Sequence, residues 1–254
     1  VDHQGIRQTW NEFNASVNAV AKGLMAYGIG QGDRVGMWSP NYAEWVYVQF
    51  ATAKIGAIQV NINPAYRTSE LEYAMNQSGC KMLVTRSEYL TSAYQDMVEQ
   101  VRPNCPDLTC VVYFDTNDWA DLLAAGESVS GQDLSARMAS LSQNDDINIQ
   151  YTSGTTGFPK GATLSHRAIL NDAKFVGMMC DYDETDRVAI PVPFYHCFGM
   201  VMGNLCCAVF GATMVIPCPT FDPAAVLRVV EAERCTSLYG VPTMFIAELG
   251  HTDL

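Results

Sequence analysis

The sequence predicts an α/β protein in which parallel-rich sheets are flanked by helices. Segments typical of strands and segments typical of helices alternate along the whole chain. Hydrophobic residues make up 48% of the chain and charged residues 17%, a balance that fits a folded core rather than a disordered segment. Strands that alternate with helices of this length favour parallel βαβ units, because each helix returns the chain to the same end of the sheet.

The first part of the chain is expected to hold four strands separated by helices. Thr9 and Glu12 have the spacing of a capping box, so a helix should begin there and end at Gly28, which can adopt the left-handed conformation. The same spacing at Ser69 and Glu72 predicts another helix start. The strands are expected at 34–38, 57–60, 81–85 and 109–114, and the remaining helices at 42–54, 91–101 and 118–125.

The second part continues the alternation after a polar stretch. Residues 126–146 are polar and are interpreted as a linker or surface excursion, with a simple long loop as the alternative. Strands are then expected at 147–152, 187–192, 212–216 and 236–240. Helices are expected from Ser165, near 198–210, over 223–234 and from Pro242.

One apolar stretch raises the alternative of a membrane protein. Residues 188–221 contain no Asp, Glu, Lys or Arg, and Gly199 and Gly203 have the spacing with which transmembrane helices pack. A spanning helix needs about 20 predominantly apolar residues in one run, whereas prolines such as Pro191 and Pro217 interrupt this stretch. We interpret it as a strand, a buried helix and a second buried strand, and we expect no transmembrane segment.

The charge pattern argues against nucleic acid as a partner. The formal net charge is -12, and residues 1–140 and 141–254 each contribute half of it. An acidic surface without a basic stripe disfavours binding to nucleic acids and to anionic membranes. The nine cysteines form no CxxC pair and no group with zinc spacing, so we expect free thiols in a reducing compartment.

The segment YTSGTTGFPKGA, at 151–162, carries the chemistry of a phosphate-binding loop. Its glycines let backbone N–H groups approach an anion, its hydroxyls can donate to phosphate oxygens or ligand Mg²⁺, and Lys160 adds a mobile charge. It is not a Walker A loop, because Pro159 rather than glycine precedes the lysine. Its place between an expected strand and an expected helix favours phosphate binding over a flexible surface turn. The residues expected to hold the phosphates of ATP are Thr152, Ser153, Gly154, Thr155, Thr156, Gly157 and Lys160.

The same segment resembles the phosphate-binding signature of the adenylate-forming (AMP-binding) superfamily, residue by residue from Thr152 to Lys160. Weaker resemblances follow in the family's order. They are found at 9–46, at 50–79, in PVPFYHCFGM at 191–200 and in LYGVPTMF at 238–245. The resemblance covers essentially the whole chain and looks closest to fatty-acyl-CoA synthetases, especially the medium-chain acyl-CoA ligase group.

The resemblance implies a reaction and a place in a larger protein. Residues 1–254 would form an incomplete part of the large N-terminal domain of the adenylate-forming fold. The family's adenine and ribose motifs and its mobile C-terminal domain with a catalytic lysine are absent from the sequence, so we expect this fragment to be inactive by itself. The intact protein would use ATP and Mg²⁺ to convert a carboxylic acid, expected to be a medium-chain fatty acid, into acyl-AMP and then, with CoA, into acyl-CoA. An intracellular location is expected, in the mitochondrial matrix or the cytoplasm, and no oligomeric state is predicted.

The resemblance also assigns roles to single residues. Lys160 would offset charge on the departing pyrophosphate, and Thr155 or its neighbour Thr152 would touch Mg²⁺. His196 would lie where the acyl pocket meets the adenylate, and with Lys160 and Thr155 it completes the predicted catalytic set. We expect His196 to position the substrate, since a carboxylate is already deprotonated near pH 7; a satisfied core histidine is the alternative.

The acyl site is expected near the end of the chain, and its substrate class stays open. The residues expected to line the acyl tunnel are Tyr239, Gly240 and Val241, and simple strand packing is the alternative for them. An amino-acid adenylation enzyme would need a buried acid near 194–206, where this chain is uncharged, so a fatty acid is favoured over an amino acid. An aryl-acid ligase and a non-catalytic nucleotide-binding fragment remain alternatives.

Overall fold

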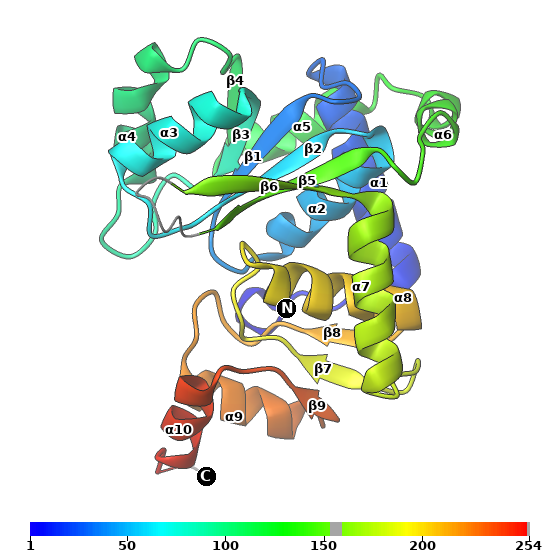
Figure 1. Cartoon of the computed structure of the whole chain (residues 1–254), viewed down its shortest axis with the longest axis vertical. Coiled ribbons are helices and arrows are strands. Elements are labelled where there is room, and N and C mark those ends of the chain that lie inside the picture. The colour runs from blue at the N-terminus through cyan, green and yellow to red at the C-terminus, as the bar shows by residue number, and fades with distance from the viewer. Residues whose placement is uncertain (153–158, 253–254) are drawn as a thin grey trace. The chain divides into compact units, whose positions relative to one another are not determined.

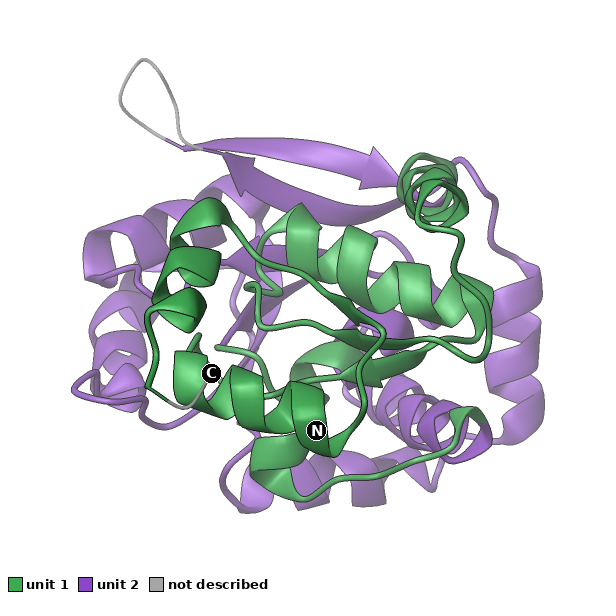
Figure 2. Cartoon of the chain, turned by 90° about the horizontal axis from the view of Figure 1, so that it is seen from below, with its two compact units in different colours: residues 1–10, 40–46, 167–254 green, residues 11–39, 47–166 purple. Residues whose placement is uncertain are grey.

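The computed structural model describes residues 1–152 and 159–252. The chain divides into two compact units (Figure 2). Unit 1 comprises Val1–Trp10, Pro40–Val46 and Arg167–Leu254, and unit 2 comprises Asn11–Ser39 and Tyr47–His166. Each unit contains a sheet that is wholly or mostly parallel, so the predicted α/β class with parallel-rich sheets is confirmed.

Unit 2 is built on a six-stranded sheet with the order β4-β3-β1-β2-β5-β6 (Figure 1). All neighbouring strands are parallel except β5 and β6, which are antiparallel. The strands are β1 Arg34–Trp38, β2 Ile58–Ile62, β3 Cys80–Thr85, β4 Cys110–Tyr113, β5 Asp146–Thr152 and β6 Lys160–Ser165. α1 Trp10–Ala26 precedes β1, and α2 Ala43–Ile55 follows it; both helices begin in unit 1. The remaining helices between the strands are α3 Thr68–Ser78, α4 Tyr94–Val101, α5 Asn117–Gly126 and α6 Gly131–Ala139.

One face of this sheet packs against α3 and α4. Val60 on β2 and Leu71 and Met75 on α3 are fully or almost fully buried in one cluster with Trp38. The ring of Trp38 stacks on Tyr94 of α4 with 3.9 Å between centroids. Burying such side chains contributes about 1.5–3 kcal/mol each, so this cluster holds the two helices on the sheet.

Unit 1 is built on a three-stranded parallel sheet with the order β8-β7-β9. Its strands are β7 Arg187–Ala189, β8 Thr213–Val215 and β9 Ser237–Leu238. Its helices are α7 His166–Met179 (from Arg167 onward), the π-helix η3 Phe198–Leu205, α8 Cys206–Phe210, α9 Pro223–Ala232 and α10 Pro242–Leu249. Two short 3₁₀ helices complete the described chain: η1 Asp2–Gln4 in unit 1 and η2 Arg102–Asn104 in unit 2.

The two glycines with membrane-helix spacing have a local packing role in unit 1. A Cβ on Gly199 would lie 2.4 Å from the carbonyl oxygen of Pro193, and one on Gly203 would lie 2.7 Å from Ile190 Cγ2. Only glycine therefore lets η3 approach the segment that follows β7 so closely. In the part of the chain that the structure describes, none of the helices has the length and apolarity needed to cross a bilayer.

Two local predictions are wrong, and both concern helix caps. The presumed linker contains α6, because Ser130 and Asp133 form a capping box: Asp133 N–H donates to Ser130 Oγ over 3.1 Å, and Ser130 N–H donates to Asp133 Oδ2 over 3.2 Å. The cap of α3 uses Glu70 rather than the expected Glu72, since the Glu70 carboxylate accepts from Arg67 N–H over 3.2 Å. In both places, polar residues cap a helix: Arg67 and Glu70 at α3, and Ser130 and Asp133 at α6.

The expectation of free thiols is confirmed. All nine cysteines are free, and several of them are buried. Burial raises the pKa of the Cys80 thiol to about 11. A thiol with so high a pKa is unreactive at neutral pH, so Cys80 behaves as a small apolar core residue.

Candidate active site

The predicted phosphate loop is described at its two ends. Thr152 ends β5 and Lys160 begins β6. The remaining predicted phosphate ligands, Ser153, Gly154, Thr155, Thr156 and Gly157, lie outside the described residues. The predicted Mg²⁺ contact of Thr155 and its catalytic role lie outside them as well.

An unpredicted strand, β6, lies between the loop and the helix expected from Ser165, which is α7. β6 pairs antiparallel with β5, Thr152 lies opposite Lys160, and the Thr152 hydroxyl is 3.4 Å from the Lys160 carbonyl oxygen that it faces. The sequence of β6 carries no apolar run, because this strand lies at the edge of the sheet and its first four residues are exposed. An edge strand of this kind has little of the periodicity that predicts a strand.

The end of the loop presents a cation that no carboxylate of the described residues neutralises. The Lys160 side chain is exposed, and within residues 1–152 and 159–252 its ammonium forms no ion pair. The backbone beside it is fixed, since the Tyr73 hydroxyl of α3 donates to the Pro159 carbonyl over 3.2 Å. An ammonium on an anchored backbone with no competing carboxylate can bind a phosphate.

His196 lies on the connection between β7 and η3, and it is exposed. It is therefore not the satisfied core histidine that the sequence left as an alternative. Its Nδ1 accepts a hydrogen bond from the Phe198 N–H over 3.2 Å. In the neutral ring this bond places the proton on Nε2, for which the described residues offer no partner, so Nε2–H can donate to a ligand.

Asn41 fixes the backbone that leads to His196, and sequence reasoning missed it. Its Nδ2 donates to the Val192 carbonyl and its Oδ1 accepts from the Phe194 N–H, both over 2.9 Å. Its side chain is buried. The only sequence signal is an asparagine after Ser-Pro. That pattern ordinarily indicates a solvent-exposed turn, whereas Asn41 is buried.

The helix after His196 begins in an uncommon form. An ordinary helix was expected near 198–210, but Phe198–Leu205 is a π-helix, and α8 follows it. π-Helical turns are rare and are found frequently at functional sites. Their presence beside His196 supports a site at this end of unit 1, and no sequence pattern would have indicated it.

The predicted acyl-site residues lie at the end of β9, and one of them packs beside the His196 segment. Tyr239 N–H donates to the Ala189 carbonyl over 3.0 Å, and the Tyr239 ring lies 5.4 Å from the Phe198 ring. The Tyr239 hydroxyl is buried, and the neighbouring Tyr182 hydroxyl shares a 2.5 Å hydrogen bond with Ser237. Burial raises the pKa of Tyr239, so its hydroxyl stays protonated.

Gly240 and Val241 link β9 to α10. A Cβ on Gly240 would lie 3.0 Å from the Phe245 ring, so glycine allows this ring to sit against the turn. Val241 is 39% exposed and directly precedes α10. The structure therefore brings Tyr239 and the His196 segment together in unit 1, whereas Thr152 and Lys160 belong to unit 2.

A family model described as "AMP-binding enzyme" matches residues 1–254. The chain belongs to the AMP-binding enzyme family. It is 44% identical over 270 residues to "Medium-chain acyl-CoA ligase ACSF2, mitochondrial" of Danio rerio, in an alignment that covers 98% of this chain and 45% of that protein. The chain thus spans less than half the length of this relative.

Two solved structures share the fold of this AMP-binding chain. The inhibitor-bound N-terminal domain of FACL13 from Mycobacterium tuberculosis has a TM-score of 0.85 and 25% identity, over 99% of this chain and 60% of that one. ATP-bound MatB from Rhodopseudomonas palustris has a TM-score of 0.81 and 26% identity, over 96% of this chain and 46% of that one. The predicted membership of the AMP-binding family and the predicted fold are confirmed.

Proposed function

We propose that this chain is part of an ATP-dependent acyl-CoA ligase that activates a medium-chain fatty acid. The observation that carries the proposal is the exposed ammonium of Lys160, which begins the strand after the phosphate loop and has no carboxylate partner in the described chain. Membership of the AMP-binding family and the similarity to a medium-chain acyl-CoA ligase support it.

The proposed reaction has two steps and needs no protein nucleophile. A carboxylate oxygen of the fatty acid attacks the α-phosphorus of ATP, and pyrophosphate leaves. The thiol of CoA then attacks the acyl carbon of the acyl-adenylate, and AMP leaves. In such reactions the protein chiefly positions the reactants and neutralises charge on the phosphates.

The loop would serve the triphosphate. Lys160 neutralises the charge that accumulates on pyrophosphate as it departs. Hydroxyl and amide groups from Thr152 to Gly157 hold the phosphate oxygens, and Thr155 or Thr152 reaches the Mg²⁺ bound with them. The metal supplies additional positive charge at the phosphates. The exposed hydroxyl-bearing end of β5 and the exposed ammonium that begins β6 fit this use.

Unit 1 would serve the acid. His196 Nε2–H donates to the carboxylate and holds it for attack. Tyr239, Gly240 and Val241 line the site of the acyl chain. The absence of Asp, Glu, Lys and Arg between residues 188 and 221 favours an alkyl chain over an amino acid, whose ammonium group would need a buried acid.

The complete activity belongs to a longer protein in this proposal. Residues 1–254 supply the phosphate loop and the His196 segment, and further segments supply the adenine and ribose contacts and a mobile lid domain. A mitochondrial matrix or cytoplasmic location is part of the same proposal.

The acid preference is tested by ATP–pyrophosphate exchange with the full-length gene product. The reaction is run with acetate, octanoate, palmitate, benzoate and leucine as separate acids. The proposal expects the highest kcat/KM with octanoate and no exchange with leucine. Exchange that is fastest with leucine or benzoate would replace the fatty-acid assignment, and ATP binding without exchange for any acid would overturn the ligase assignment.

A further inference from the structure

Four amide side chains are buried together between β2 and β5. Gln59 and Asn61 lie on β2, and Asn148 and Gln150 lie on β5. Gln59 pairs with Asn148 and Asn61 pairs with Gln150, so the four side chains project from one face of the sheet. None of the four is more than 5% exposed. We name these four residues the amide quartet.

Asn61 is the centre of the hydrogen-bond network in the quartet. Its Oδ1 accepts from Gln59 Nε2 over 3.0 Å and from Asn148 Nδ2 over 2.9 Å. Its Nδ2 donates to Gln150 Oε1 over 3.1 Å. Asn148 Nδ2 also lies 3.1 Å from the backbone carbonyl of Gln59. Side-chain bonds therefore cross from β2 to β5 in addition to the bonds of the strand ladder.

Stability alone does not account for these amides. On the opposite face of the same strand, Val60 and Ile62 are fully buried in an apolar cluster. The quartet even leaves two acceptors, Gln59 Oε1 and Asn148 Oδ1, buried without a partner in the described chain. An apolar face would avoid that penalty, whereas a buried polar network has a specific use: it selects one arrangement of the strands.

The arrangement that the quartet selects is the register of β5 on β2. A shift by one residue would replace Asn148 and Gln150 on this face by the apolar side chains next to them and break every cross-strand amide bond. β5 in turn is the only neighbour of β6 in the described sheet. The whole β5–β6 hairpin thus joins the sheet through the strand pair that the quartet links.

The hairpin carries the two described residues of the proposed phosphate site. Gln150 precedes Thr152 by two residues, and Thr152 pairs with Lys160. We propose that the amide quartet is a positioning device that locks the β5–β6 hairpin in one register and thereby places Thr152 and Lys160 for the triphosphate. This inference rests on the proposed function, and none of the four residues touches the substrate in it.

The test compares two neighbouring substitutions in the full-length protein. Asn61→Leu replaces the centre of the quartet with an apolar side chain that also branches at Cγ, and Val60→Ala opens the apolar face of the same strand. Both should lower the thermal midpoint. Only Asn61→Leu should raise the KM for ATP, by about 10-fold or more, because displacing a positioning group by about 1 Å has effects of this size. The KM for the fatty acid should stay within about two-fold in both, since that site belongs to other residues.

Hydrogen–deuterium exchange gives a readout that does not depend on activity. Asn61→Leu should speed exchange in 146–152 and 160–165 relative to β3, and Val60→Ala should not. If Asn61→Leu fails to fold, Gln150→Met removes one acceptor of the network and takes its place. Unchanged ATP KM together with unchanged exchange in the hairpin would overturn the inference.

The outcomes also separate this inference from the proposed function. If the unaltered protein exchanges pyrophosphate but the quartet variants keep both its ATP KM and its hydrogen–deuterium exchange in the hairpin, the positioning role is wrong and the ligase stands. If the unaltered protein exchanges pyrophosphate with no acid, the ligase is wrong. In that case, faster hydrogen–deuterium exchange confined to the hairpin of Asn61→Leu would still support a positioning quartet. Equally faster hydrogen–deuterium exchange in Asn61→Leu and Val60→Ala would refute it.

Discussion

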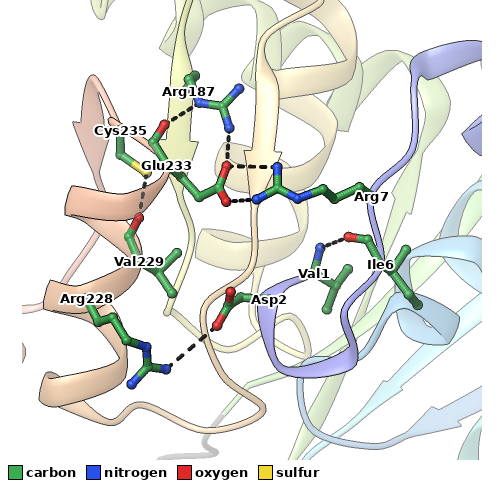
Figure 3. Close-up of polar contacts among 9 residues, drawn as sticks. All are labelled: Val1, Asp2, Ile6, Arg7, Arg187, Arg228, Val229, Glu233 and Cys235. Atoms are coloured by element: carbon green, nitrogen blue, oxygen red, sulfur yellow. Dashed lines mark hydrogen bonds and ion pairs between the residues drawn. The ribbon is translucent and has the colours of Figure 1, made fainter.

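The two units each contain a dense polar network, and the two networks are built from different chemistry. In unit 2 the amide quartet is neutral and buried on every side. In unit 1 the Glu233 carboxylate accepts hydrogen bonds from Arg7 and Arg187 (Figure 3). Arg7 is 76% exposed, whereas the Glu233 side chain is 12% exposed. The network of unit 1, in which Arg7 reaches water, is therefore made of charged side chains, and the fully buried network of unit 2 is made of neutral amides.

The difference follows from the cost of desolvation. A buried amide needs only hydrogen bonds, but a buried charge also needs a counter-charge and still loses its hydration. The Glu233 cluster meets that need and ties Arg7 of the N-terminal segment to the residue that follows α9. The hydrogen bond from Arg7 and the charges of both guanidiniums hold the pKa of Glu233 below its ordinary value. The comparison predicts that only the unit 1 cluster responds to pH.

A charge placed in the quartet should have the largest effect. Asn61→Asp keeps the shape and the acceptor of Asn61 but buries a carboxylate without a counter-charge. We expect a loss of about 3 kcal/mol or more in the free energy of unfolding at pH 7. Burial raises the pKa of this carboxyl in the folded state, so the loss should shrink as the pH falls toward 4.

Urea denaturation at pH 7 and pH 4.5 measures this change. Asn61→Leu is the control, because it has no group that titrates in this range. An Asn61→Asp variant as stable as the unaltered protein at pH 7 would show that the quartet is open to water.

Removing Asn41, whose side chain clamps the backbone at Val192 and Phe194 in unit 1, should have an intermediate effect on stability. Asn41→Ala leaves the Val192 carbonyl and the Phe194 N–H buried without their partner, and we expect a loss of about 1–3 kcal/mol. The clamp is neutral, so this loss should be the same at pH 5 and pH 7. Because the clamp fixes the segment that carries His196, the KM for the acid should rise more than the KM for ATP. A larger rise for ATP would contradict the assignment of this segment to the acid.

Neutralising the charged cluster should have a smaller effect. Glu233→Gln removes the negative charge that faces Arg7 and Arg187, and exposure and salt weaken such pairs, so we expect a loss of about 1 kcal/mol or less at low salt. Urea denaturation at 0.05 M and about 1 M NaCl should show the loss fading as salt screens the pair. A loss that salt does not change would mean that packing, not charge, stabilises the cluster.

The pH dependence of that variant should be the smallest effect. The folded pKa of Glu233 is lowered from its ordinary 4.5, so its contribution is present above 4.5 and is lost as the pH falls through the folded value. The unaltered protein and Glu233→Gln should therefore differ in unfolding free energy at pH 7 and converge at acidic pH. A difference that grows on acidification would reverse the sign and refute the ion-pair account.

The sequence predicted the strands that are buried on both faces better than the edge of the sheet. The strand expected at 34–38 is β1, because both of its faces are covered and its residues read as one apolar run. β6 was missed because an exposed edge strand has no such run. α6 was missed because the capping box of Ser130 was overlooked within a polar stretch.

The residues of the candidate site could be predicted from a motif, whereas the side chains that pack around it could not. Thr152 and Lys160 could be predicted as phosphate ligands because hydroxyl, glycine and lysine residues in one loop are the groups that bind phosphate. The quartet could not, because the alternation in IQVNI and INIQ ordinarily indicates a strand with one face in water. The hydrogen bonds of Asn41 could not be predicted either, since their partners Val192 and Phe194 lie 151 and 153 positions further along the chain.

The most direct test of the account is the effect of Lys160→Ala on ATP–pyrophosphate exchange by the full-length protein with octanoate. Lys174→Ala, which removes another exposed lysine, is the matched control. The account predicts that exchange falls by about 10²-fold or more in Lys160→Ala, as loss of one preorganised charge typically causes, and is unchanged in Lys174→Ala. Exchange at the unaltered rate in Lys160→Ala, with the same thermal midpoint, would contradict it.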